Sequence, residues 1–222
     1  MLNEFNICVI GLRERKDRWN RCKEVLQEAG VKKVTHWVTE CNYEDKYKGY
    51  MGDFLKMLKH FRGKPLMFFE DDFELTNNWR EVFNEALKEL PKTYDLLYLG
   101  ANLREPVTRA GNHLVRVYGA WLMHATLISP KFIEDILLHY PPANIRIIDE
   151  WYRKIAKTRE FFMTFPMISY QRADFSDFVG QYVNYDIFNN GLYKRAYEDF
   201  RDVTPVSTAS QCRSGVDGSR DE

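Results

Sequence analysis

The sequence has few cysteines, no long hydrophobic run and no excess of charge of either sign. Its four cysteines among 222 residues form no CxxC pair, so we expect reduced thiols and a cytoplasmic protein rather than a disulfide framework. The first residues carry no basic region ahead of an apolar stretch, and no apolar run approaches the roughly 20 residues of a membrane-spanning helix. We therefore expect neither a signal peptide nor a transmembrane segment.

The charged residues balance, with 32 Lys and Arg against 32 Asp and Glu. A dedicated nucleic-acid-binding protein normally carries a basic excess on one face or helix, so we expect no nucleic-acid partner. The chain also lacks the motifs G-x-G-x-x-G, Walker A, H-E-x-x-H and G-x-S-x-G. Their absence argues against a dinucleotide-binding fold, a P-loop kinase, a zinc site and an α/β-hydrolase.

What the chain does have is a regular alternation of short apolar strands and amphipathic helices. This pattern predicts an α/β/α sandwich with a mostly parallel central sheet and a smaller antiparallel excursion. We expect residues 1–203 to form one domain and the polar residues 204–222 to be a disordered tail or linker. The expected strands cover 7–10, 34–38, 66–69 and 95–99, with 114–118 and 122–128 as a hairpin or mixed edge and a late strand in 161–170; the expected helices cover 19–29, 51–61, 78–90 and 129–140, and another begins at 149.

Three consecutive carboxylates, Glu70, Asp71 and Asp72, end the apolar strand at 66–69. They repel one another and are costly to desolvate, so a cation is expected beside them. Oxygen ligands suit Mg²⁺ or Mn²⁺, which proteins often hold through one or two carboxylates and the phosphates of a substrate. The alternative is a solvated acidic turn before the next helix.

A basic turn follows the first strand. Its position, at a strand end and ahead of a helix, could receive the phosphates or base of a nucleotide. The alternative is a solvated charge run that pairs with its own Glu14 and Asp17. The cations of this turn are Arg13, Arg15, Lys16 and Arg18.

Further candidates lie later in the chain. Asp149 and Glu150 begin a helix, where a carboxylate could act as a general base or Asp149 could simply cap the helix. The polar cluster 171–177 follows an apolar strand and ends in Ser176 and Asp177, which could also be a cap. Three aromatic residues, Tyr118, Trp121 and Tyr152, are of the kind on which sugar rings stack, although core positions are the commoner reading.

Taken in order, these motifs resemble glycosyltransferase family 25, the lipopolysaccharide and collagen-type sugar transferases with a GT-A fold. They are also similar to the small GT-A transferases of large DNA viruses. The resemblance covers about residues 7 to 185. It is carried by Val9-Ile10-Gly11-Leu12 with Arg15-Lys16-Asp17-Arg18-Trp19, by Phe68-Phe69-Glu70-Asp71-Asp72-Phe73-Glu74-Leu75, by Tyr94-Asp95-Leu96-Leu97-Tyr98-Leu99-Gly100, by Asp149-Glu150-Trp151-Tyr152, and by Gln171 with Ser176-Asp177.

The resemblance implies a metal-dependent, inverting transfer of a hexose from a nucleotide-diphosphate sugar, UDP-linked, to a hydroxyl of a glycan or glycoprotein. Asp72 and Glu70 would hold Mn²⁺ or Mg²⁺, with Glu70 and Asp71 orienting the ribose or a metal-bound water. Asp149 is the first choice for the base and Glu150 the second. The residues expected around the nucleotide are Gly11, Arg13, Arg15, Thr39, Glu40 and Asp177.

Two departures leave the donor open. The family usually has Asn at the position of Gly11, and its Ser-His pair ahead of the acidic strand has no match around Gly52 and Asp53. Two other classes also stay open: a non-catalytic carbohydrate- or partner-binding domain, and a phosphotransfer domain of the receiver type with its acidic residues at strand ends.

Overall fold

An eight-stranded mixed sheet forms the centre of the molecule. The computed structural model describes residues 2–39, 45–139 and 147–201, and over these the strand order is β2-β1-β3-β10-β5-β11-β8-β7. Strands β10 and β8 run against the other six. The strands are β1 (Asn6–Leu12), β2 (Thr35–Thr39), β3 (Leu66–Glu70), β5 (Leu96–Tyr98), β7 (Thr108–Arg109), β8 (Leu114–Arg116), β10 (Ala125–Ile128) and β11 (Phe161–Thr164).

Helices cover both faces of this sheet. Helices α1 (Lys16–Glu28) and α3 (Trp79–Glu89) pack on one face, and α2 (Lys46–His60), α4 (Pro130–Leu138) and α5 (Ile148–Ile155) pack on the other. Alternate residues of the strands enter the two cores, so that Val9 faces α1 while Cys8 and Ile10 face α2. This two-sided burial explains the continuous apolar runs. The predicted α/β class, a sandwich with helices on both faces of a sheet in which six of the eight strands run the same way, is confirmed.

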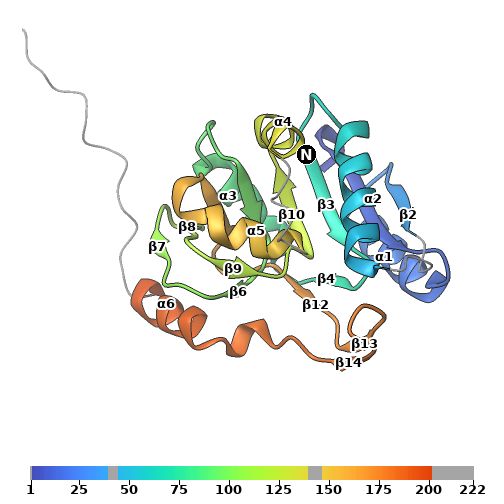
Figure 1. Cartoon of the computed structure of the whole chain (residues 1–222). Helices are drawn as coiled ribbons and strands as arrows, with labels where there is room; N and C mark the ends of the chain where they lie inside the picture. The colour runs from blue at the N-terminus through green and yellow to red at the C-terminus, as the bar shows by residue number, and fades with distance from the viewer. Residues whose placement is uncertain (1, 40–44, 140–146, 202–222) are drawn as a thin grey trace, which may run out of the picture.

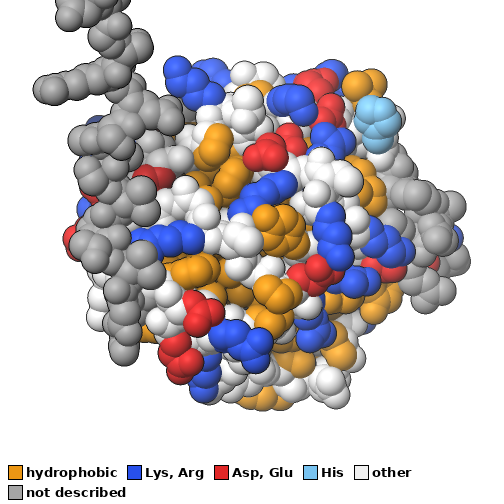
Figure 2. All heavy atoms as spheres, turned by 90° about the vertical axis from the view of Figure 1, so that its left-hand side faces the viewer, with side chains coloured by type: hydrophobic (Ala, Val, Ile, Leu, Met, Phe, Trp, Pro, Cys, Tyr) orange, Lys and Arg blue, Asp and Glu red, His pale blue; other side chains and the backbone are white. Residues whose placement is uncertain are grey.

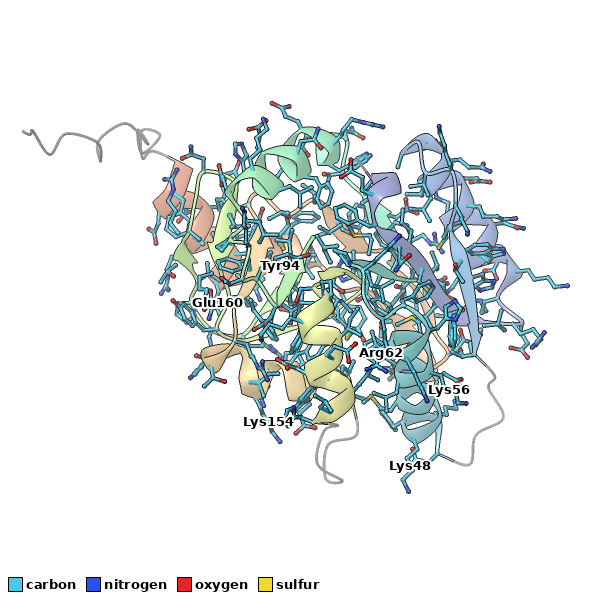
Figure 3. All side chains as sticks on the ribbon, turned by 90° about the horizontal axis from the view of Figure 1, so that it is seen from above. Lys48, Lys56, Arg62, Tyr94, Lys154 and Glu160 are labelled. Carbon is cyan, nitrogen blue, oxygen red and sulfur yellow. The ribbon has the colours of Figure 1, made fainter. Side chains whose placement is uncertain are left out.

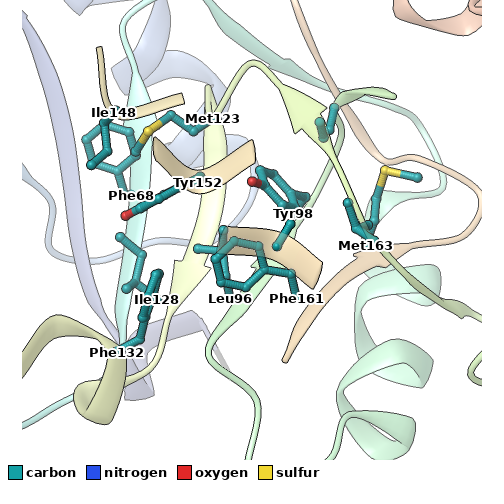
Figure 4. Packing of buried hydrophobic residues seen from close by; sticks show 14 of the residues in the cluster. Phe68, Leu96, Tyr98, Met123, Ile128, Phe132, Ile148, Tyr152, Phe161 and Met163 are labelled. Atoms are coloured by element: carbon teal, nitrogen blue, oxygen red, sulfur yellow. The ribbon is translucent and has the colours of Figure 1, made fainter. Parts of the chain in front are cut away.

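Aromatic packing fixes α5 on the sheet. Phe132 of α4, Tyr152 of α5 and Phe161 of β11 form a cluster in which the ring centroids of Phe132 and Phe161 are 5.2 Å apart and those of Tyr152 and Phe161 are 5.7 Å apart. Figure 4 shows this cluster together with Tyr98 and Phe68. The start of α5, which carries Asp149, is therefore held against the body of the protein.

The order of the later strands differs from the sequence prediction. The expected hairpin of 114–118 with 122–128 is wrong, because β8 pairs with β11 while β10 lies between β3 and β5. Every residue of β10 is buried, as a central position requires, and sequence proximity alone did not reveal this. Asn78 and Glu81 have the spacing of a capping box at the start of α3 but do not form one. The Asn78 side chain makes no cap hydrogen bond and instead accepts one from the Thr76 hydroxyl, 2.8 Å away.

The last part of the described chain runs along one edge of the sandwich (Figure 1). Strand β12 (Ser169–Gln171) pairs with β4 (Phe73–Leu75), and β13 (Asp174–Ser176) forms a hairpin with β14 (Gln181–Val183). Helix α6 (Gly191–Arg201) follows and contributes Tyr193 and Ala196 to the core. The sequence analysis missed this helix. The remaining short elements are β6 (Asn102–Leu103), which pairs with β9 (Ala120–Trp121), and the 3₁₀ turns Leu2–Glu4, Ala156–Thr158 and Ile187–Asn189.

The surface carries charges of both signs. Figure 2 shows basic and acidic side chains interspersed on the face that includes α6. On α2, Lys48 and Lys56 point outward, whereas Arg62 lies between α2 and α4 and pairs with Glu134 (Figure 3). No helix in the described ranges is long and apolar enough to cross a membrane.

Two of the four cysteines, Cys8 and Cys22, are buried free thiols. Cys41, Cys212 and the predicted tail at 204–222 lie outside the described residues. The assignment of residues 1–203 to one domain stays a prediction.

Candidate functional site

The carboxyl ends of three parallel strands meet at one edge of the sheet. In the register of these strands, Leu12 of β1 lies opposite Thr39 of β2, and Ile10 of β1 lies opposite Glu70 of β3. Ligands of open α/β sheets bind beyond such strand ends. A cleft of about 460 Å³ opens there and is lined by Ile10, Gly11, Leu12, Arg18, Thr39, Lys46, Tyr47, Tyr50, Glu70, Asp71, Asp72, Asn102, Arg104, Trp121, Leu122, Ile147, Ile148, Asp149, Gln171, Ser176, Asp177, Phe178, Val179, Val183 and Tyr185.

Two of the three consecutive carboxylates converge on one amide. Gln171 Nε2 lies 3.2 Å from Glu70 Oε2 and 3.3 Å from Asp72 Oδ1, and the Tyr50 hydroxyl donates to Glu70 Oε1 at 3.0 Å. Gln171 reaches this position because β12 pairs with β4, the strand that follows Asp72 directly. The amide thus holds two carboxylates of like charge close together in the cleft.

This convergence changes the acidity of both groups. Burial, and then the charge of Asp72, raise the pKa of Glu70 well above its usual range. Burial and the charge of Asp71 raise the pKa of Asp72 to about 6, against the opposing effect of Arg18. Gln171 Oε1 is buried and has no hydrogen-bond partner among the described residues. The cluster is therefore short of positive charge and of one hydrogen-bond donor.

The third carboxylate has its own cation. Arg18 Nη1 donates to Asp71 Oδ1 at 2.9 Å and lies 3.7 Å from Asp72 Oδ2. Burial would lower the pKa of Arg18, but Asp71 and Asp72 together hold it above its ordinary value. Arg18 also donates to Asp174 Oδ2 and to the Phe175 carbonyl of β13, at 3.0 and 2.7 Å. One guanidinium thus connects the acidic strand end to the β13–β14 hairpin.

We expect Arg18→Gln to lower the free energy of unfolding by about 3–5 kcal/mol, because it leaves the buried Asp71 without its partner. Arg21→Gln, one turn further along α1, is the matched control. Arg21 is 43% exposed and its partner Glu74 keeps Arg172, so a loss of about 1 kcal/mol or less is expected. Urea unfolding of both variants measures the difference, and equal losses would contradict the assigned role of Arg18.

Glycine is required at position 11 by the approach of Asp71. A Cβ at Gly11 would lie 2.6 Å from Asp71 Oδ2, closer than any normal contact. Thr39 supports the same backbone, since its hydroxyl donates to the Gly11 carbonyl at 3.3 Å. The absence of a side chain at Gly11 therefore gives Asp71 room to reach Arg18.

We expect Gly11→Ala to destabilise the fold by about 1–3 kcal/mol, as overpacking does, and to weaken ligand binding in the cleft by displacing Asp71. Gly52→Ala is the control. Gly52 lies in α2, its added Cβ would meet nothing within 4 Å, and the change should raise stability by about 0.5–1 kcal/mol. Thermal unfolding of the two variants in parallel tests whether stability falls in Gly11→Ala and rises in Gly52→Ala.

The basic turn divides between the cleft and the hairpin. Arg15 Nη1 and Nη2 lie 2.6 Å from Asp177 Oδ2 and 3.0 Å from Asp174 Oδ2, so Arg15 fixes the hairpin and is not among the residues that line the cleft. Asp177 lines it. Arg13 is exposed and does not. The cation that the structure brings to the acidic residues is Arg18, which the sequence analysis placed in the turn without singling it out.

Asp149 faces the acidic cluster from α5. Burial raises its pKa to about 6, while a hydrogen bond from the Leu122 backbone opposes this rise. That N–H donates to Asp149 Oδ2 at 2.9 Å. Leu122 has a φ of +73°, which is rare for a side chain of this kind, so Asp149 holds an unusual backbone conformation. Ile147 stands at the N-cap position of α5 without a cap hydrogen bond, and Asp149 lies inside the helix and accepts from Leu122, so the capping role considered for Asp149 is wrong.

Several predicted residues lie away from the cleft. Glu150 pairs with Lys154 at 2.8 Å, and Figure 3 shows Lys154 projecting from the outside of the molecule. Tyr152 is fully buried in the core, and Tyr118 contacts Thr108. Of the three aromatic candidates, Trp121 alone lines the cleft. Glu40 lies outside the described residues.

Other cleft residues were not singled out from the sequence. Tyr50, Lys46, Arg104 and Leu122 all line the cleft. Tyr50 follows the helical spacing of α2, whereas Arg104 lies in a polar stretch that reads as a surface loop. Only the pairing of β6 with β9, at Asn102 opposite Trp121, brings that stretch to the site.

The donor set fits a hard divalent cation that a substrate completes. Over residues 2–39, 45–139 and 147–201, no group of three or more His, Cys, Asp or Glu side chains is arranged to hold a metal ion. Glu70 and Asp72 offer two carboxylates at one point, and two suffice for Mg²⁺ or Mn²⁺ when phosphates supply further oxygens. Burial, and then the charge of a neighbouring carboxylate, raise the pKa of both groups, and a bound cation would favour their ionised forms. Among the described residues that line the cleft, five carry carboxylates and three are cationic.

No protein-family model matches the chain, and no curated protein matches it. Membership in glycosyltransferase family 25 therefore stays a prediction. Among solved structures, A197 from STIV is similar at 15% identity with a TM-score of 0.44, covering 81% of this chain and 93% of that one.

Two further solved structures are similar at 8% identity and a TM-score of 0.38. One is a glycosyltransferase involved in the glycosylation of the major capsid of PBCV-1, with 72% of this chain and 93% of that one covered. The other is UDP-glucose pyrophosphorylase from Acinetobacter baumanii, with 84% and 67% covered. At such scores these likenesses say nothing of activity, and function is inferred from the cleft itself.

Proposed function

We propose that the cleft binds a nucleotide-diphosphate sugar together with Mn²⁺ or Mg²⁺ and transfers its hexose to a hydroxyl of a glycan or glycoprotein. One observation carries this proposal: Glu70 and Asp72 converge on Gln171 at the strand ends, in a cleft where acidic side chains outnumber basic ones. A diphosphate would be repelled by such a cleft unless a divalent cation came with it.

Each residue then has a definite task. Asp72 and Glu70 would hold the cation, which when bound offsets the charge that develops on the departing diphosphate. Arg18 holds Asp71 in place and opposes the rise that burial causes in the pKa of Asp71, and its guanidinium also lines the cleft, where it can contact the ligand. Gln171 orients the two carboxylates, and its unpaired Oε1 can accept a hydrogen bond from a ligand hydroxyl or water.

The acceptor hydroxyl needs a group that takes its proton. Asp149 lines the same cleft, and its charge acts on Glu70 strongly enough to help raise the pKa of that residue. A carboxylate with a pKa of about 6 is mostly ionised at neutral pH yet basic enough to receive a proton. Inversion at the anomeric carbon follows from a single displacement assisted by this base. UDP is the nucleotide that the resemblance implies.

The direct test is turnover. The protein is incubated with a panel of nucleotide sugars and Mn²⁺, and release of the nucleoside diphosphate is measured with and without excess chelator. We expect release from one class of nucleotide sugar and its loss on chelation. Binding of a sugar without any need for a nucleotide would instead favour a carbohydrate-binding domain, and labelling of Asp71 or Asp72 by acetyl phosphate would favour a receiver-type domain.

A further inference from the structure

Two guanidinium groups gather around one tryptophan of the cleft wall. Arg104 Cζ lies 6.0 Å from the centroid of the Trp121 ring, and Arg153 Cζ lies 5.8 Å from it. Trp121 and Arg104 line the cleft, whereas Arg153 is not among the lining residues and is tied to this wall by its contact with the Trp121 ring. Cation–π contacts of this kind hold guanidinium groups in place without neutralising them. The wall therefore presents fixed positive charge to the cleft.

These guanidinium groups have no carboxylate partner among the described residues. The acidic neighbour of Arg104, Glu105, pairs with Lys157 at 2.9 Å. Glu150, three residues before Arg153, pairs with Lys154. Arg153 Nε is buried and lacks a hydrogen-bond partner within the described part of the chain. A buried N–H donor without an acceptor lowers the stability of the folded state unless a ligand supplies the acceptor.

Helix α5 places this cationic wall beside Asp149. Asp149 and Arg153 are four residues apart in α5, so they share the side of the helix that packs on β9. Their Cβ atoms are expected to be about 5–6 Å apart, as i and i+4 positions are. This spacing is comparable to the width of one sugar ring. A ligand could therefore present a hydroxyl to Asp149 and an anionic group to Arg153 and Arg104 from the same residue.

We propose that the acceptor is an anionic sugar, bearing a carboxylate or phosphate, that Arg104 binds this group from the cleft wall, and that Arg153, held with Arg104 against Trp121, adds its positive charge. The inference rests on the proposed function. A neutral acceptor has no need of two such cations, whereas an anionic one would be repelled by Asp149 and Glu70 without them. The diphosphate of the donor is also an anionic group that guanidiniums can bind. The guanidiniums are assigned to the acceptor because Arg153 shares its helix face with the base.

The test compares matched sugars and matched variants. Dissociation constants of methyl β-glucuronide, glucose 6-phosphate and the neutral methyl β-glucoside are measured by ligand-observed NMR in the presence of UDP and Mn²⁺. We expect wild-type protein to bind at least one of the anionic sugars about tenfold or more tightly than the glucoside. Arg104→Gln/Arg153→Gln should abolish this preference. Arg195→Gln, on the exposed side of α6, should keep it.

The same variants are tested for thermal stabilisation by UDP with Mn²⁺, which separates the two sources of anionic group. An unchanged UDP effect in the double variant supports the acceptor assignment, whereas its loss assigns the guanidiniums to the donor and overturns the inference. Equal or absent binding of charged and neutral sugars to wild type overturns it as well, as does a preference that survives the double substitution. If the double variant is unfolded, the exposed Arg104→Gln alone should reduce the preference about threefold or more.

The inference and the proposed function fail in different ways. An anionic preference that depends on Arg104 and Arg153, in a protein that UDP with Mn²⁺ does not stabilise, would leave an anionic-sugar site and remove the transferase. UDP binding that requires Mn²⁺, without any preference among the sugars, would leave the transferase and remove the anionic acceptor.

Discussion

Asp72→Asn should lower metal-dependent release of nucleoside diphosphate at least a hundredfold while leaving the fold intact. Asparagine has nearly the same shape and its amide oxygen can still accept from Gln171, so the loss reports on the charge that holds the cation. Burial already disfavours the Asp72 carboxylate, and stability should therefore stay the same or rise. Initial rates across a Mn²⁺ titration measure the effect.

The control for this change is Asp199→Asn, at an exposed position of α6, which should leave both the rate and the Mn²⁺ dependence as they are. Wild-type rates in Asp72→Asn, or wild-type protein that works undiminished in excess chelator, would contradict the assignment of Glu70 and Asp72 as the metal site.

Asp149→Asn is expected to reduce turnover about 10²–10⁴-fold, the usual contribution of a positioned base, with donor affinity nearly unchanged. The variant can keep the hydrogen bond from the Leu122 N–H, because its side-chain oxygen can accept as Asp149 Oδ2 does. Structural disturbance is thereby separated from loss of the proton acceptor. Single-turnover rates and a donor binding isotherm measured together distinguish the two, and a selective loss of donor binding would make Asp149 a binding residue.

The pH dependence of the wild type follows from the same group. Because the pKa of Asp149 is about 6, turnover at saturating Mn²⁺, which holds Asp72 in its ionised form, should rise between pH 5 and pH 7 and then level off. The folded state holds this proton to higher pH than the unfolded chain, whose carboxyl has an ordinary pKa. The contribution of Asp149 to the free energy of unfolding therefore falls as pH rises from about 4 through 6. Asp149→Asn should remove both the kinetic step and this part of the stability slope.

Much of the architecture could be predicted from local patterns. The apolar spacing of a strand or helix follows directly from which of its faces is buried. The apolar run of β3 is buried on both faces and ends in Glu70 at the sheet edge, as the sequence indicates. Helix α6 was not predicted although Tyr193 and Ala196 have helical spacing, since charged residues are as numerous in it as apolar ones. The central place of β10 depends on which strands it joins, and that is a long-range property.

The site divides in the same way. Glu70, Asp71, Asp72 and Asp149 stand at element ends, where sequence position indicates a functional edge, and all four line the cleft. The position of Arg104 beside Trp121 depends on the short pairing of β6 with β9. No periodic pattern in the sequence predicts this pairing.

The balance of charge over the whole chain conceals this local polarity. Net charge is zero, yet Arg18 forms ion pairs with three carboxylates. In contrast, Arg104 and Arg153 contact Trp121 and have no carboxylate partner in the described ranges. Neutral composition is thus compatible with a site that binds a charged donor, provided that a divalent cation mediates the contact.

The most direct test of this account is a thermal-shift comparison of wild type and Asp72→Asn with UDP, Mn²⁺, both and neither. A ligand that binds only the folded state stabilises it, and the gain grows with the logarithm of the ligand concentration relative to its Kd. The proposed site predicts stabilisation of wild type by UDP only when Mn²⁺ is supplied, and none of this joint effect in Asp72→Asn. Equal stabilisation by UDP with and without Mn²⁺, or the same joint effect in both proteins, would contradict the metal-dependent site.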